Sequence, residues 1–213
     1  MRQAVVLGTG GHCRVILSLL AACGQHQVLQ IIELGEHHLN ERIMGHSITP
    51  FASALMNLAG KEDIDVFLAI GDNATRRHWW AKIMESGLPM PNLISPHAVV
   101  DATAKLGEAN VVCAKAFIGP ESRIGVNNLI NTGATVEHEV VIGSHCHLAP
   151  SSTVAGRSRL EDLCFIGAGA TIIDKLSVAS ATTLGAGATL IRDVEESGGV
   201  YVGVPARRTR TQQ

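Results

Sequence analysis

Two adjacent residues near the middle of the chain, His138 and Glu139, carry the groups that a proton transfer needs. A histidine titrates near neutral pH and can act as a general base, and a neighbouring carboxylate can orient the ring and stabilise its protonated form. Because neither neighbour of His138 is a cysteine or a serine, the pair suits direct attack by an amine or hydroxyl, without a covalent intermediate on the protein. The same pair would also suit an exposed turn that has no function.

A glycine-rich segment near the start, Gly8-Thr9-Gly10-Gly11, could bind phosphate. It follows an apolar run and precedes a helical pattern, and backbone N–H groups at the start of a helix attract anions. Cys13 stands where a dinucleotide-binding motif has its third glycine, although Glu33, at the end of the second apolar run, could accept a hydrogen bond from a ribose hydroxyl. NAD is therefore a weaker expectation than another nucleotide.

The first half of the chain alternates strand and helix patterns. Apolar runs at 4–7, 28–32 and 65–70 predict strands. Helical spacing at 15–20 and a polar, basic composition at 74–86 predict helices. Such alternation predicts a parallel sheet that helices cover on both faces. We therefore expect an α/β, Rossmann-like half-domain over residues 1–88.

The second half has a single repeat. Every sixth residue from Ile94 to Leu190 is Leu, Ile or Val, and the phase never slips. This period is typical of a β-helix, in which three repeats of six residues complete one coil of about eighteen residues. The low aromatic content of 3% fits a narrow core of aliphatic side chains. We expect a left-handed parallel β-helix over residues 89–213.

Composition excludes several classes of partner. The net charge of −2 gives no electrostatic reason to expect nucleic acid. The sequence has no apolar run long enough to span a membrane, and its start predicts a core strand instead of a signal peptide. Its five cysteines show no CxxC pairing, so we expect a reduced, cytoplasmic protein without membrane insertion.

Four segments in this order make the chain resemble the hexapeptide-repeat acyltransferases of the sialic-acid O-acetyltransferase and UDP-4-amino-sugar N-acetyltransferase type. These are Gly8-Thr9-Gly10-Gly11-His12, Ala69-Ile70-Gly71-Asp72-Asn73, Asn131-Thr132-Gly133-Ala134-Thr135-Val136-Glu137-His138-Glu139 and Val202-Gly203-Val204-Pro205-Ala206-Arg207. The resemblance implies transfer of acetyl from acetyl-CoA to the amino group of a nucleotide-activated, UDP-linked 4-amino deoxysugar. It also implies a homotrimer with each active site between two β-helices.

The resemblance further implies a role for each motif. His138 is the general base, and Glu139 tunes it. The residues expected to bind the sugar nucleotide are Gly10, Gly11, His12, Glu33, Gly71, Asp72, Asn73 and Asn131. The residues expected to bind acetyl-CoA are His147, Gly167, Ala168, Gly185, Ala186 and Arg207. Several of these have plainer explanations: asparagine is common at β-helix corners, repeat turns need glycine, and Arg207 could belong to a solvated basic tail.

Other functions remain open at this stage. O-acetylation of a sialic-acid-like sugar, a succinyl or other acyl donor, and a non-catalytic sugar-nucleotide-binding β-helix protein all fit the sequence. A set of three histidines, His138, His145 and His147, could imitate the zinc site of γ-class carbonic anhydrases, which share the β-helix. We expect no metal, because the glutamate beside His138 suits a base better than a ligand. We expect His145 to lie on the surface.

Overall fold

The computed structural model describes residues 1–35, 41–51 and 63–209. It divides into two compact units, Met1–Pro96 and His97–Gln213, whereas the sequence suggested a division between residues 88 and 89. Within the described residues, no helix is both long and apolar enough to cross a membrane. An α/β region followed by a parallel β-helix confirms the predicted fold class.

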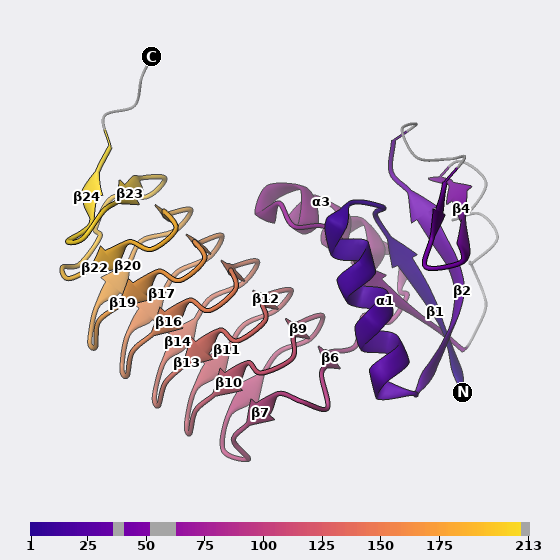
Figure 1. Ribbon diagram of the computed structural model, residues 1–213, viewed down its shortest axis with the longest axis horizontal. Coiled ribbons are helices and arrows are strands. Elements are labelled where there is room, and N and C mark those ends of the chain that lie inside the picture. Colours follow the sequence, from indigo (N-terminus) through magenta and orange to yellow (C-terminus); the bar gives the residue numbers. More distant parts are fainter. Residues whose placement is uncertain (36–40, 52–62, 210–213) are drawn as a thin grey trace. The chain divides into compact units, whose positions relative to one another are not determined.

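The N-terminal unit is a small α/β sandwich around a sheet of order β3-β4-β2-β1-β5 (Figure 1). Its elements are β1 (Arg2–Leu7), α1 (Gly11–Cys23), β2 (His26–Glu33), β3 (Arg42–Ile43), β4 (His46–Pro50), β5 (Ile64–Leu68), α3 (Asn73–Ser86) and β6 (Leu93–Ile94). The strands β1, β2, β4 and β5 pair in parallel, while β3 pairs with β4 in the antiparallel sense. The expected alternation of strand and helix is confirmed.

The C-terminal unit is a β-helix whose short strands stack on three sides (Figure 1). The β13 side contains β7 (Val99–Val100), β10 (Phe117–Ile118), β13 (Thr135–Val136), β16 (Thr153–Val154), β19 (Thr171–Ile172) and β22 (Thr189–Leu190). The β14 side contains β8 (Lys105–Leu106), β11 (Arg123–Ile124), β14 (Val141–Ile142), β17 (Arg159–Leu160) and β20 (Ser177–Val178). The β15 side contains β9 (Val111–Val112), β12 (Leu129–Ile130), β15 (His147–Leu148), β18 (Phe165–Ile166), β21 (Thr183–Leu184), β23 (Val200–Val202) and β24 (Arg207–Arg208).

Pairing between coils keeps a constant register. Phe117 pairs with Thr135, Thr135 with Thr153, and Thr153 with Thr171. Each step is a whole coil, so residues at one corner stack over their equivalents in the next coil. We call the three corners after residues in them: the Asn131 corner (113–116, 131–134, 149–152, 167–170, 185–188), the His138 corner (101–104, 119–122, 137–140, 155–158, 173–176) and the His145 corner (107–110, 125–128, 143–146, 161–164, 179–182).

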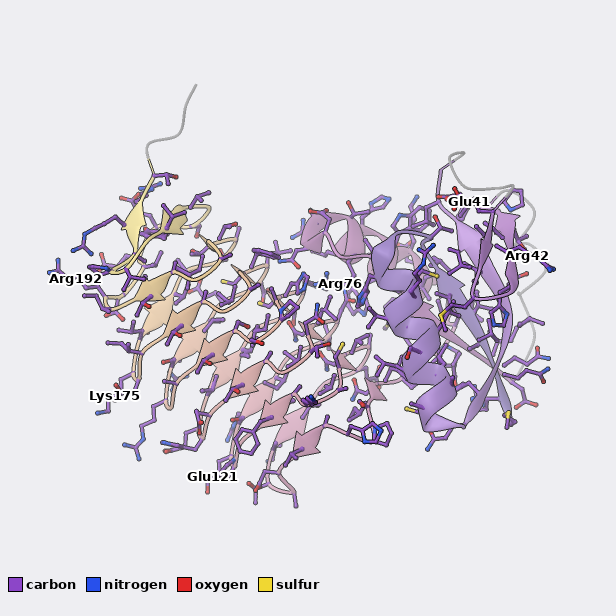
Figure 2. All side chains as sticks on the ribbon, in the orientation of Figure 1. Glu41, Arg42, Arg76, Glu121, Lys175 and Arg192 are labelled. Atoms are coloured by element: carbon purple, nitrogen blue, oxygen red, sulfur yellow. The ribbon has the colours of Figure 1, made fainter. Side chains whose placement is uncertain are left out.

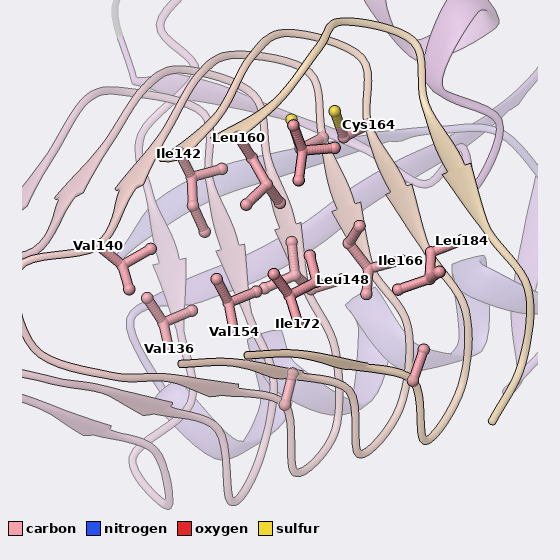
Figure 3. Packing of buried hydrophobic residues seen from close by; sticks show 14 of the residues in the cluster. Val136, Val140, Ile142, Leu148, Val154, Leu160, Cys164, Ile166, Ile172 and Leu184 are labelled. Carbon is pink, nitrogen blue, oxygen red and sulfur yellow. The ribbon is translucent and has the colours of Figure 1, made fainter. Parts of the chain in front are cut away.

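Aliphatic side chains from all three sides fill the interior of the β-helix (Figure 3). Every sixth residue from Val112 to Leu190 is at most 4% exposed. The first residue of the predicted run, Ile94, is not part of this core, because it is 37% exposed. Its neighbour Leu93 is buried instead, so the repeat contributes to the core only after its first members.

From Ala109 to Gly187, the fourth residue of each repeat has a positive φ, whether or not it is glycine. Gly133, Glu139, His145, Ser151 and Arg157 all have φ between 58° and 66°. This left-handed conformation turns the chain at each corner, at a cost that non-glycine residues meet only when the surrounding structure holds them in place. The corners therefore place polar side chains at fixed positions.

Candidate functional site

His138 and Glu139 form a hydrogen-bonded pair at the His138 corner. The Nδ1 atom of His138 lies 3.0 Å from Oε2 of Glu139. Glu139 occupies the left-handed position of the corner, with φ of 59°, and both side chains are partly exposed, at 49% and 40%. Since Nδ1 faces the carboxylate, Nε2 is the ring nitrogen left to take up a proton from a substrate.

The next coil supports this pair from the other side. Nε of Arg157 donates to the same Oε2 atom of Glu139 at 2.9 Å, and Gly156 lies against the imidazole of His138. Hydrogen bonds from His138 and Arg157 hold the pKa of Glu139 below its usual value of 4.5. Glu139 is therefore ionised throughout the neutral range. The sequence analysis missed both Gly156 and Arg157, although each lies one coil of eighteen residues after a member of the pair.

Asn131 and His147 form a second polar group at the Asn131 corner. Nδ2 of Asn131 lies 3.3 Å from Nε2 of His147, and the ring of His147 stands edge-on to Phe165, with centroids 5.1 Å apart. His147 lies in β15, one coil after β12, the strand that Asn131 follows. The structure therefore brings together one residue expected to bind the sugar nucleotide and one expected to bind acetyl-CoA.

The two polar groups lie on different corners of the β-helix. The whole β13 side separates Asn131 from His138. The segment from Asn131 to His147 therefore does not lie on one face of the β-helix. Because each repeat turns at a corner, a segment of this length winds around most of one coil.

His145 is buried, contrary to our expectation that it lies on the surface. It is 8% exposed, and its Nδ1 atom lies 2.8 Å from Nδ2 of Asn127 at the same corner in the preceding coil. The three histidines of the possible zinc set thus have different environments: His138 beside Glu139, His145 beside Asn127 and His147 beside Asn131. Over the described parts of the chain, no group of three or more His, Cys, Asp or Glu residues could hold a metal ion.

The residues expected to bind acetyl-CoA continue along the Asn131 corner. Gly167-Ala168 and Gly185-Ala186 lie in successive coils there, and both alanines are exposed. The backbone groups of the glycines are less free than expected, because the N–H groups of Gly167 and Gly185 donate to carbonyls of the next coil. A Cβ atom at Gly167 would lie 2.6 Å from the backbone nitrogen of Ala186. Close stacking therefore explains this glycine without a ligand.

Arg207, the last residue expected at acetyl-CoA, begins β24 and is exposed. Its Nη1 atom donates to the carbonyl oxygen of Ala206 at 3.1 Å. Its neighbour Arg208 pairs with Glu196. These contacts order the end of the described chain and leave Arg207 on the surface of the β-helix.

The glycine segment of the N-terminal unit leads into α1. Gly8 has φ of 105°, and a Cβ atom there would lie 2.8 Å from the carbonyl oxygen of Ala69, so only glycine fits. Gly10 caps α1 without a side-chain hydrogen bond, Gly11 is exposed, and the first turn, which contains His12, has no acidic residue. This helix start has the composition expected of an anion site.

Glu33 is buried at the end of β2 and makes contacts within the unit. Its Oε2 atom accepts a hydrogen bond from Thr9 of the glycine segment, and its Oε1 atom accepts one from the N–H of Gly35 at 2.9 Å. Glu33 therefore joins the glycine segment to the end of β2. Binding of a ribose hydroxyl by Glu33 stays a prediction.

Gly71, Asp72 and Asn73 lie where β5 leads into α3. Asp72 caps α3 by accepting a hydrogen bond from the N–H of Thr75 at 2.8 Å. The buried Arg76 holds the segment from behind, with bonds to the carbonyls of Ile70 and Gly71 and to Oδ1 of Asn73. Figure 2 labels this arginine. Sequence analysis missed Arg76 because a charged residue in a basic helix usually faces solvent.

A shallow hollow of about 760 Å³ lies on the β14 side, beside the His138 corner. Glu139 lines it together with residues of the neighbouring coils. The other lining residues are Thr103, Lys105, Glu121, Arg123, Val141 and Arg159. The hollow is therefore polar and contains charges of both signs.

Comparison with known proteins extends this description. Residues 3–83 match the family of the PglD N-terminal domain. A GDP-perosamine N-acetyltransferase from Caulobacter crescentus, solved with CoA and GDP-perosamine as a variant in which one histidine is alanine, is 33% identical over 98% of this chain and 97% of its own, with a TM-score of 0.91. The acetyltransferase domain of PglB from Neisseria gonorrhoeae is 31% identical over 98% of this chain and 100% of its own, with a TM-score of 0.90, and it has also been solved with acetyl coenzyme A. No curated protein matches.

Proposed function

The chain belongs to the hexapeptide-repeat sugar acetyltransferases, and we propose that it transfers acetyl from acetyl-CoA to the amino group of a nucleotide-linked amino sugar. The observation that carries this proposal is the hydrogen-bonded pair of His138 and Glu139, which is the arrangement that a neutral-pH general base requires. The solved structures with CoA, acetyl-CoA and GDP-perosamine support the donor and the type of acceptor.

The reaction follows from the chemistry of this pair. The amine nitrogen attacks the thioester carbonyl carbon, and Nε2 of His138 takes a proton from that nitrogen as the C–N bond forms. The C–S bond then breaks, and the proton passes to the departing sulfur to give the CoA thiol and the amide. Glu139 keeps Nδ1 of His138 oriented and stabilises the imidazolium that forms in between.

The N-terminal unit is our proposed site for the nucleotide, with phosphates at the start of α1 and the segment Gly71-Asp72-Asn73 beside them. The sequence suggested a UDP carrier, but the sugar nucleotide in the structures at 33% and 32% identity is linked to GDP. We therefore propose a GDP-linked amino sugar as the acceptor.

We also propose that the active unit is a homotrimer. One β-helix carries His138 and Glu139 at one corner and Asn131 and His147 at another. If the His138 corner of one copy faces the Asn131 corner of the next, the base from one chain meets the proposed acetyl-CoA track of its neighbour. A closed ring of three such heterologous contacts completes every site.

The test combines acetyl-CoA with GDP-, UDP- and dTDP-linked amino sugars and follows release of the CoA thiol. We expect turnover with an amino sugar and formation of an amide, and we expect the H138A variant to lose about 10²- to 10⁴-fold in kcat while remaining folded. An ester product on a hydroxylated acceptor would instead indicate O-acetylation. Binding of nucleotide sugars without release of thiol under any condition would indicate a non-catalytic protein and refute the proposal.

A further inference from the structure

The coil that follows the catalytic pair stacks directly on it. Thr135 and Thr153 pair in neighbouring strands of the β13 side, and the N–H of Arg157 donates to the carbonyl oxygen of His138 at 3.0 Å. Gly156 and Arg157 therefore lie over His138 and Glu139 in a fixed register. Side chains at these two positions therefore lie next to the pair.

Gly156 leaves room for the ring of His138. A Cβ atom at position 156 would lie 2.6 Å from both Cε1 and Nε2 of that ring. The backbone itself does not demand glycine, because the equivalent residues one coil before and one coil after are His138 and Asp174, and φ at position 156 is not in the left-handed region. Glycine at position 156 is thus explained by the imidazole of His138, which occupies the space that a side chain would need.

Arg157 fixes the carboxylate on the opposite side. Its Nε atom and Nδ1 of His138 lie 2.9 and 3.0 Å from the same Oε2 atom of Glu139. Glu139 is thereby held between a cation and the base. The other ionisable groups of this corner and of the adjoining β14 side are Asp101, Lys105, Glu121, Arg123, Glu137, Arg159, Asp174 and Lys175. Figure 2 shows Glu121 and Lys175 projecting along this edge of the β-helix.

We propose that Gly156 and Arg157 are positioning residues that set the orientation and the proton affinity of the His138–Glu139 pair. This inference rests on the proposed role of His138 as the base. Arg157 limits how strongly Glu139 favours the protonated imidazole, because part of the carboxylate's charge is neutralised by the guanidinium. Gly156 keeps the ring in the orientation that leaves Nε2 available.

The first test replaces Arg157 by Gln and by Lys, with K175Q as a matched control. Lys175 has the same left-handed corner position one coil further on and pairs with Asp174, not with Glu139. Loss of the nearby cation in R157Q favours protonated His138, so we expect the acidic limb of the pH profile of kcat/KM to move to higher pH and kcat to fall about tenfold. R157K keeps the charge, so its acidic limb should stay near that of the wild type. K175Q should match the wild type in both respects.

The second test is G156A, which adds one methyl group beside the ring. Displacement of His138 should lower kcat by about 100-fold, with KM for acetyl-CoA nearly unchanged and the midpoint of thermal unfolding retained. The imidazole resonance of His138 in NMR spectra should shift. H138A is measured in parallel. If H138A keeps full activity, the assignment of His138 as the general base is refuted. If H138A is inactive but G156A and R157Q behave like the wild type and K175Q, only the positioning role is overturned.

Discussion

At the scale of single residues, Glu139 shows how a β-helix corner joins neighbours in sequence into the pair that we propose to be catalytic. Side chains of adjacent residues usually diverge, but the left-handed conformation at Glu139 returns its carboxylate to Nδ1 of His138. Hydrogen bonds from His138 and Arg157 lower the pKa of this carboxyl. Glu139 therefore stays ionised as the pH falls toward 4.5.

We predict that E139Q lowers kcat by at least about tenfold with little change in KM, because the amide no longer stabilises the imidazolium that forms during transfer. Steady-state kinetics over the neutral range would measure this effect. E121Q is the matched control, since Glu121 occupies the same left-handed position one coil earlier. Equal effects of E139Q and E121Q would argue for general electrostatics of the corner in place of a specific contact.

The cysteines give a second prediction at the residue scale. Burial raises the pKa of Cys13 and of Cys113 to about 11, and Cys146 and Cys164 have no exposed surface. Cys23 is only partly buried, so we predict that a thiol reagent at neutral pH modifies Cys23 alone in the native protein. Mass spectrometry after labelling would identify the site. Rapid labelling of Cys146 or Cys164 would contradict the closed interior.

At the scale of elements, the beginnings of three parallel strands share one buried charge. Asp65 of β5 accepts hydrogen bonds from Arg2 of β1 and His26 of β2 at 2.7 and 2.8 Å. Burial by itself raises the pKa of Asp65, but the bonds from Arg2 and His26 outweigh it and hold the pKa below 3.8. The carboxylate thus links the strands that carry the glycine segment and Glu33.

We predict that D65N lowers the free energy of unfolding at neutral pH by about 1 to 3 kcal/mol, because two donors lose a charged acceptor. A lowered pKa in the folded state gives stability that is present above pH 3.8 and is lost as the pH falls through the folded-state pKa. The difference between D65N and wild type should therefore shrink in acid. Denaturant unfolding at several pH values, followed at the tryptophans of α3, measures it; a difference independent of pH would contradict this account.

Sequence periodicity predicted the elements well where one rule governs many residues. Strict spacing by six specified the β-helix because every coil repeats the same inward position, and alternating strand and helix patterns specified the N-terminal sheet. His145 and Ile94 were misjudged, since neither spacing nor residue type reveals which corner residues turn inward or where the covered core begins. Arg157 was missed because its partner, Glu139, is near only after a whole coil is closed.

At the scale of the whole molecule, the division of polar groups between two corners is the feature that bears on assembly. The side between these corners carries no charged residue, since its outward residues are Val99, Phe117, Thr135, Thr153, Thr171 and Thr189. The β14 side carries Lys105, Arg123 and Arg159. A neutral side is the better candidate for contact with other copies of the chain.

We predict that two inactive variants complement each other. H138A damages one corner and N131A the other. A site between copies is therefore intact only where its His138 comes from an N131A chain and its Asn131 comes from a neighbouring H138A chain. Random mixing in a ring of three should leave about one quarter of the sites complete. Activity measured after the variants are unfolded and refolded together tests this result. Lack of recovery, with mixed oligomers confirmed by mass, would place each site within one chain.

The eighteen-residue register also sets lengths in discrete units. Along the Asn131 corner, Asn131 and Gly185 lie three coils apart, and each coil adds about 4.8 Å, the spacing of neighbouring strands. The track proposed for the pantetheine arm can therefore be lengthened or shortened only by whole coils, since any other insertion rotates the following residues onto another side. The length of the β-helix can thus change only in steps of one coil, and a change in the reach of the donor would require the gain or loss of eighteen residues at once.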